Sequence, residues 1–296
     1  MIDHRILTFI DVCETRSLTK TAKNLCLTQP AVTQHIKFLE QTYQVKLLVY
    51  EGKQMKLTEA GQVFLEGALK TKALLTETSQ KMYELDNKQL VLNVGVTLSI
   101  ADYVMPEVIE AYMKENKEIR MRIAVDNTTH LIDKLTRGEL EFAVVEGYFD
   151  KSLFYFQLLQ QDDFILVASP QCELRDSVTL DELKNQPLII RESGSGSRDI
   201  LEKLLANSNC SINQFKYYHE VGSIKLIKHL VESNCGITFI YKEAVKQELR
   251  EKRLKQIEVN SIQMKREFNF IYLKTSASKD KMLNFFEFTQ KFLAVQ

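Results

Sequence analysis

The sequence predicts an α plus α/β protein with an N-terminal winged helix-turn-helix, a long linker helix and a C-terminal domain of two lobes. Two observations predict this class. Residues 17–40 have the pattern of two short helices joined by a tight corner, and beyond residue 88 apolar strand-like runs alternate with helical patterns. The length of 296 residues also exceeds one average domain. We place the three parts at residues 1–58, 59–88 and 89–296.

The helix-turn-helix is predicted from apolar spacing and from capping residues. Apolar side chains recur every three or four residues, as on the buried face of a helix. The first helix carries Leu18, Ala22 and Leu25 on that face, and the second carries Val32, Ile36 and Leu39. Thr28 is a good N-cap, and Pro30 falls in the first turn, where its missing N–H costs no hydrogen bond. Cys13 and Cys26 fall on apolar faces and are expected in the core.

The second helix and the segment after it carry side chains suited to DNA. A two-stranded wing is predicted over residues 46–58, with its turn at Glu51-Gly52. Residues 15–58 contain seven Lys/Arg and two Glu, whereas the whole chain balances 39 basic with 39 acidic residues. A local basic surplus suits phosphate binding, and polar side chains on the second helix suit base edges in the major groove. The predicted DNA contacts are Thr28, Gln29, Pro30, Ala31, Thr33, Gln34, Lys37, Lys53 and Lys56. For His35 a phosphate contact and a packed or solvated ring remain equally open.

These motifs resemble the LysR-type transcriptional regulators over essentially the whole chain. The matches are Phe9 to Ser17, the stretch Leu27-Thr-Gln-Pro-Ala-Val-Thr-Gln-His-Ile-Lys37, and Leu57-Thr-Glu-Ala-Gly61. The resemblance implies a regulator that binds double-stranded promoter DNA as a homodimer or as a dimer of dimers, a homotetramer. RNA polymerase is a further implied partner. The family usually carries Leu-Phe-x-Arg near the wing, but here Leu48 and Tyr50 stand at the Phe and Arg places. Lys53 is therefore expected to carry more of the wing's contact with DNA.

The linker helix at 59–88 is expected to join two chains. Thr58 can cap it, and seven residues recur at alternating spacings of four and three, which is a heptad seam. They are Phe64, Ala68, Thr71, Leu75, Thr78, Met82 and Leu85. The alternative is a helix that lies on its own domain. We favour a dimer contact because the helix joins two domains and has little of its own chain to cover this stripe.

The C-terminal part is expected to form two α/β lobes around a mainly parallel sheet. Strands are expected at 90–96, 119–125, 141–145, 164–169, 188–191, 236–240 and 268–273, and helices at 100–116, 128–137, 197–206, 224–233 and 281–293. The chain then crosses twice between lobe I, about 89–162 and 267–296, and lobe II, about 163–266. Such an arrangement resembles the periplasmic-binding-protein fold.

A ligand in such a fold binds between the lobes, at strand ends and helix starts. Four loops there carry hydroxyls or glycines, which suit a small anion, and Arg198 adds a positive charge. The predicted effector residues are Thr97, Ser99, Thr128, Thr129, Ser193, Gly194, Ser195, Gly196, Ser197, Arg198, Gly222 and Ser223. In the family, Ser and Thr at the places of Thr97 and Ser99 commonly line the effector pocket. The effector is expected to be a small anionic metabolite of unknown identity, and no cofactor is expected.

Other functional classes find little support in the sequence. It has no phosphate-binding loop, no HExxH and no Gly-x-Ser-x-Gly, so no catalytic residues are assigned, and its five histidines lack metal-ligand spacing. An alternative within the family is a redox switch that uses Cys172, Cys210 and Cys235. A stand-alone solute-binding protein would explain residues 89–296 but not the basic head. The absence of a signal segment, of an 18-residue apolar run and of paired cysteines predicts a cytoplasmic protein.

Overall fold

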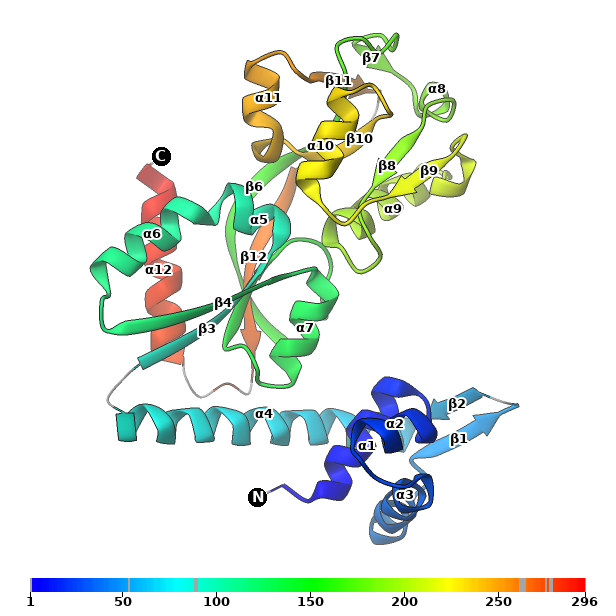
Figure 1. Ribbon diagram of the computed structural model, residues 1–296, viewed down its shortest axis with the longest axis vertical. Coiled ribbons are helices and arrows are strands. Elements are labelled where there is room, and N and C mark those ends of the chain that lie inside the picture. The colour runs from blue at the N-terminus through cyan, green and yellow to red at the C-terminus, as the bar shows by residue number, and fades with distance from the viewer. Residues whose placement is uncertain are drawn as a thin grey trace. The chain divides into compact units, whose positions relative to one another are not determined.

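The computed structural model describes residues 2–52, 54–87, 90–260, 265–274, 276 and 279–295. The chain forms two compact units (Figure 1). One unit contains the N-terminal head with the long helix, and the other contains the two α/β lobes. Within the described ranges, none of the helices combines the length and apolar character needed to cross a membrane.

The N-terminal unit is a helix-turn-helix head with a wing and one long helix (Figure 1). Its elements are α1 (His4–Thr15), α2 (Leu18–Asn24), α3 (Gln29–Tyr43), β1 (Leu48–Glu51), β2 (Gln54–Leu57) and α4 (Glu59–Asn87). Ser17 and Thr28 cap α2 and α3, and each side chain accepts a hydrogen bond from the backbone N–H three residues further on. Phe9, Val32 and Leu39 lie at the centre of a small core shared by these helices. The predicted winged helix-turn-helix is confirmed.

Two residues at the end of α2 depart from the prediction. Leu25 and Cys26 are exposed rather than buried. Because α2 ends at Asn24, both belong to the corner, and Cys26 adopts a left-handed backbone conformation with φ of 54°. Cys13 on α1 is half-buried as expected, and burial raises the pKa of its thiol to about 12.

The long helix α4 begins where the sequence predicts. Thr58 accepts a hydrogen bond from the Gly61 N–H at 2.9 Å, which caps the first turn. The predicted seam, however, has one end packed in the head and the other end exposed. Phe64 packs against Phe9 and Tyr43, with ring centroids 5.2 and 5.0 Å away, so this end of the seam belongs to the head's own core. Further along, Leu75, Met82 and Leu85 are exposed on α4.

Lobe I is built around a mixed sheet with helices on both faces (Figure 1). Its elements are β3 (Leu90–Thr97), α5 (Leu98–Tyr103), α6 (Met105–Glu115), β4 (Ile119–Asp126), α7 (Thr128–Thr136), β5 (Phe142–Val145) and α12 (Lys279–Val295). Strand β3 pairs in parallel with β4 and β5. The single helix expected over 100–116 is two helices, because Pro106 occupies the first turn of α6 and cannot donate a backbone hydrogen bond to a preceding turn.

Lobe II contains several short elements that apolar patterns did not reveal. Its elements are β7 (Ser177–Val178), α8 (Leu180–Leu183), β8 (Leu188–Ile190), α9 (Gly196–Asn207), η1 (Ile212–Gln214), β9 (Tyr218–Glu220), α10 (Ile224–Glu232), β10 (Thr238–Tyr241), η2 (Glu243–Val245), α11 (Lys246–Arg250) and β11 (Lys255–Val259). The prediction missed β7, α8, β9, α11 and β11. Strands of two to five residues are too short for alternation to stand out, and the exposed β9 has no apolar face.

Two long strands run side by side through both lobes, β6 (Phe154–Ala168) and β12 (Lys265–Leu273) (Figure 1). Strand β6 pairs antiparallel with β12 over its first part and with β10 and β11 over its second part. The expected mainly parallel sheet is therefore wrong for the middle of the domain, where antiparallel pairing prevails. The two-lobed fold with two crossings is confirmed.

Candidate nucleic-acid interface and interlobe site

The face of α3 opposite the core carries the predicted DNA contacts. Gln34 and Lys37 are exposed, whereas Val32, Ile36 and Leu39 are buried. Gln29 Nε2 donates to Thr33 Oγ1 at 3.1 Å, and Thr33 Oγ1 donates to the Gln29 carbonyl at 3.1 Å. Residues 29, 33 and 37 are four apart and therefore share one face. This face offers amide, hydroxyl and ammonium groups in one row. Thr28, Pro30 and Ala31 lie at the start of α3, as predicted.

The wing forms as predicted, and one of its lysines pairs with a glutamate of the same hairpin. Strands β1 and β2 pair antiparallel, and Gly52 at the turn has a φ of 64°. Lys56 Nζ lies 2.5 Å from a Glu51 carboxylate oxygen across the hairpin. The pair is exposed and therefore contributes little to stability. Tyr50 is 61% exposed, and Lys53 lies outside the described residues.

His35 is a structural residue rather than a free surface group. Its Nδ1 is 2.9 Å from Thr8 Oγ1 on α1, and its ring contacts the His4 ring edge to face. Burial, and to a smaller extent the nearby positive charges of His4 and Arg5, lowers the pKa of His35. The neighbouring Phe38 is covered by the Arg5 guanidinium, 3.5 Å from the ring centroid. These contacts hold α3 packed against α1.

In the second unit, the predicted hydroxyls gather around a residue that the sequence analysis overlooked. Glu146 directly follows β5 and is only 2% exposed. Thr97, at the end of β3, donates from Oγ1 to the Glu146 carboxylate, and Ser197 Oγ of α9 lies 3.5 Å from its other oxygen. Thr97, Ser99, Thr128, Ser195 and Ser197 are all buried. The signal that could have revealed Glu146 is its place after the buried run 142–145, the same kind of position that Thr97 holds after β3.

Burial raises the pKa of Glu146, because a carboxylate loses its hydration there. The hydrogen bond from Thr97, the charge of Arg191, the residue's own backbone N–H and the hydrogen bond from Ser99 act in the opposite direction. Arg191 is itself engaged, since its Nε and one terminal nitrogen lie 2.8 and 2.9 Å from the two carboxylate oxygens of Glu192. The cluster is thus a buried carboxyl group held mainly by hydroxyls.

The glycines in this region bring the two lobes together. Between the lobes, the Thr129 N–H donates to the Gly194 carbonyl at 3.2 Å. Within lobe I, Thr128 Oγ1 donates to the Glu146 carbonyl at 2.9 Å. A Cβ at Gly196 would collide with the Glu146 carbonyl oxygen. These glycines were expected to let backbone approach a ligand, and here they let the loops of one lobe approach the loops of the other.

Other predicted effector residues lie away from the buried carboxyl group. Arg198 Nε lies 2.8 Å from Glu202, and Nη1 of the same guanidinium donates to Glu220 and, at 3.3 Å, to the Arg191 carbonyl. This guanidinium therefore pairs with carboxylates of its own lobe. Ser193 is exposed, and Ser223 next to Gly222 caps α10 by accepting from the Leu226 N–H at 3.3 Å.

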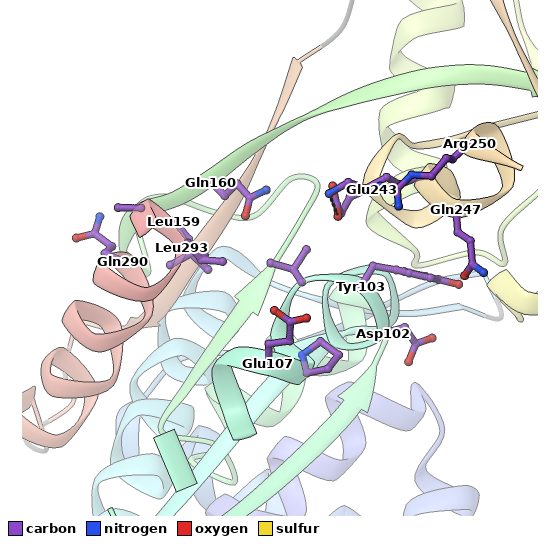
Figure 2. A pocket seen from close by; sticks show the side chains of 14 residues that line it. Asp102, Tyr103, Glu107, Leu159, Gln160, Glu243, Gln247, Arg250, Gln290 and Leu293 are labelled. Atoms are coloured by element: carbon purple, nitrogen blue, oxygen red, sulfur yellow. Dashed lines mark hydrogen bonds and ion pairs between the residues drawn. The ribbon is translucent and has the colours of Figure 1, made fainter. Parts of the chain in front are cut away.

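A separate pocket of about 1070 Å³ is lined by α5, α6, β6, η2, α11 and α12. Figure 2 shows Tyr103 and Glu107 on one side of it and Glu243, Gln247 and Arg250 on the other. None of the predicted effector residues lines this pocket. All five cysteines are free thiols, with Cys172 and Cys210 buried and Cys235 exposed.

Comparison with known families decides the identity of both units. The model described as "LysR substrate binding domain" matches residues 86–294, and that described as "Bacterial regulatory helix-turn-helix protein, lysR family" matches residues 4–62. The chain belongs to the LysR family. It is a DNA-binding transcriptional regulator with an effector-binding domain, and the helix-turn-helix match rules out the stand-alone solute-binding alternative.

Individual relatives are distant but cover nearly the whole chain. The chain is 23% identical to "HTH-type transcriptional regulator CysL" of Bacillus subtilis, with 90% of this chain and 89% of that protein aligned. It is 27% identical to "Probable RuBisCO transcriptional regulator" of Cyanidioschyzon merolae, with coverage of 94% and 93%.

Solved structures of LysR regulators share the fold. An H2O2-bound OxyR mutant of Corynebacterium glutamicum aligns with a TM-score of 0.62 at 20% identity, covering 98% of this chain and 92% of that one. The Synechocystis CcmR regulatory domain in complex with 2-PG aligns at 0.62 with 17% identity, covering 69% and 97%. The QuiR effector domain in complex with shikimate aligns at 0.60 with 19% identity, again covering 69% and 97%.

Proposed function

We propose that this regulator recognises promoter DNA through the exposed row of α3 and through its wing. The observation that supports this most strongly is the capped helix whose inward face is buried and whose outward face presents Gln29, Thr33, Gln34 and Lys37. Two such heads, joined along α4, would read two half-sites, and two dimers would read four. The exposed apolar residues of α4 supply the surface for this association. We place the protein in the cytoplasm, with RNA polymerase as a further partner at the promoter.

We further propose that a small metabolite binds between the lobes and changes how the dimers sit on DNA. Thr97, Ser99, Thr128, Ser195 and Ser197 would form the centre of this site, with Thr129, the 193–198 loop and Gly222-Ser223 at its margin. The complexes of CcmR with 2-PG and of QuiR with shikimate support a ligand of metabolite size. The ligand shifts the protein only by its difference in affinity for two domain arrangements. We expect that ligand to carry an anionic group.

A reporter gene under the target promoter tests this site. Thr97→Val removes a hydroxyl at nearly constant shape, and we expect it to lower the induction ratio at least fivefold while the protein stays folded. Arg198→Ala separates two roles of the loop: loss of induction assigns the guanidinium to the ligand, whereas unchanged induction with lower stability assigns it to Glu202 and Glu220. A normal induction ratio in both variants would reject the interlobe site.

A further inference from the structure

The carboxylate of Glu146 stands where a ligand anion was expected. Thr97 and Ser99 from lobe I and Ser197 from lobe II all direct hydrogen bonds to it. Ser197 lies in the first turn of α9, a helix of twelve residues whose free N–H groups favour negative charge. Hydroxyls and a helix start are the groups that would bind an anionic ligand, but here they bind a side chain of the protein itself.

The two arginines beside this cluster are already paired with carboxylates and attract a second anion only weakly. Arg191, the cation that acts on Glu146, already makes two short contacts with Glu192, and Arg198 pairs with Glu202 and Glu220. Above its raised pKa the Glu146 carboxyl group is ionised and repels a second anion strongly, since little water screens charges in a buried site. A ligand group that donates a hydrogen bond would instead meet an acceptor.

Two buried hydroxyl oxygens of this domain lack hydrogen-bond partners among the described residues. They are Ser195 Oγ and Tyr241 Oη, and Ser195 is the residue before α9. Burial, and after it the charge of Glu146, raises the pKa of the Tyr241 hydroxyl. Unpaired buried hydroxyls are costly, and a polar ligand at the start of α9, where Gly196 packs on the Glu146 backbone, would satisfy Ser195.

We infer that Glu146 determines the ligand class of the interlobe site: it rejects simple anions from the hydroxyl cluster and requires an effector that donates a hydrogen bond, from an ammonium or hydroxyl group, to its carboxylate. This inference rests on the proposed function, because it specifies the ligand of that same site. The anionic group expected on the effector then has to lie elsewhere, away from Thr97 and Ser197.

The test uses the full chain and three small probes that share a carboxylate. Acetate carries no donor, glycolate adds a hydroxyl and glycine adds an ammonium group. Thermal shifts are measured against sodium chloride at equal ionic strength, because a ligand that binds the native state raises its melting temperature. We expect the wild-type protein to bind glycolate or glycine at least tenfold more tightly than acetate. Equal or tighter binding of acetate by the wild type would overturn the inference.

A matched pair of variants tests the anion position directly. Glu146→Ala empties the space of one carboxylate, and we expect formate or acetate to stabilise this variant saturably, with at least tenfold tighter binding than in the wild type. Glu173→Ala, which removes an exposed carboxylate, should behave like the wild type. If Glu146→Ala folds but gains no affinity for formate or acetate, the inference is wrong. This criterion holds even if the wild type binds none of the three probes. If Glu146→Ala does not fold, Glu146→Ser is judged by the same criterion.

The proposed function fails in a different way. A reporter response that survives Thr97→Val together with Ser99→Ala would reject the interlobe effector site, whatever formate does to Glu146→Ala. The opposite result is also distinguishable. If those hydroxyl variants lose the response but Glu146→Ala gains no formate binding, the interlobe site stands and only the role assigned to Glu146 is rejected.

Discussion

At the scale of single residues, the two functional surfaces differ in how their polar groups are used. Gln34 and Lys37 on α3 are exposed to solvent. Thr97 and Ser197 are buried and already bonded to Glu146. Exposed groups such as Gln34 and Lys37 are free to face DNA, whereas a ligand at the second site has to replace or extend the hydrogen bonds of Thr97 and Ser197.

Gln34→Ala tests the base-reading role of α3. An amide that contacts a base edge contributes about 1–3 kcal/mol of discrimination, so we expect a loss of that size in specific binding and a relaxed preference at one base position. Lys37→Ala should weaken specific and non-specific binding alike. Gel shifts at fixed salt measure both, with Lys114→Ala on the exposed face of α6 as the control. Unchanged affinity and preference in Gln34→Ala would remove this residue from the interface.

Glu146 predicts a pH dependence of stability. Its pKa is raised in the folded protein, so the folded state holds the proton at pH values where the unfolded chain has lost it. Below pH 4.5, the ordinary pKa of a glutamate, the carboxyl group is protonated in both states and costs no stability. As pH rises from there through the folded pKa, the unfavourable contribution of the buried ionised group grows to its full size. Arg191 opposes the shift, but its charge is shared with Glu192.

We therefore expect the free energy of unfolding of Glu146→Gln to exceed that of the wild type at pH 8. The difference should shrink as pH falls toward 5. Urea unfolding across this range measures it, and Glu173→Gln serves as an exposed control. A difference between Glu146→Gln and wild type that does not change with pH would show that Glu146 titrates normally.

At the scale of elements, the start of α9 depends on backbone contact with the loop after β5. Gly147 has a φ of 91°, and a Cβ on it would lie 2.6 Å from Gly196 Cα. Neither residue tolerates a side chain without moving the other lobe's loop. Glycine at these two positions therefore sets how closely β5 and α9 approach.

Gly196→Ala should destabilise the lobe contact although alanine favours helices. The new methyl group meets the Glu146 carbonyl, which is backbone and cannot rotate away, so we expect a loss of about 1–3 kcal/mol in unfolding free energy. Gly222→Ala is the matched control, because its Cβ would lie 3.6 Å from a Glu192 oxygen, an ordinary contact. Equal stability of the two variants would mean that the loops separate easily.

At the scale of the whole molecule, α4 carries the surface proposed for association. Met82 is 66% and Leu85 80% exposed, and Leu75 lies seven residues before Met82 on the same face. Apolar side chains in such a row on one helix mark an interaction surface. Phe64, at the other end of the row, is already used by the head.

Leu75→Glu combined with Met82→Glu should separate the dimers. Each substitution would bury a carboxylate without a partner, so we expect the dissociation constant to rise at least 100-fold. Sedimentation measures the mass of the complex. Exchange of charges between Glu66 and Lys70, an ion pair on another face of α4, is the control and should leave the mass unchanged. A dimer that survives the double substitution would exclude this row as the contact.

The sequence by itself determined the helices and strands that are specified by residues close together in the chain. Thr28, Pro30 and the apolar spacing of 32, 36 and 39 sufficed for α3, because caps and helical periodicity act within a few residues. The same local signals indicated the strands that end at Thr97 and before Thr128, and so the hydroxyls of the effector site.

Only the tertiary structure decided what those hydroxyls bind. Thr97, Glu146 and Ser197 lie about fifty residues apart in turn, and no spacing rule links residues at that separation. The same holds for the antiparallel pairing of β6 with β12 and for Arg198, whose partner Glu220 comes from β9. Contacts between distant segments depend on how the sheet closes, and that depends on burial summed over the whole core rather than on any short pattern.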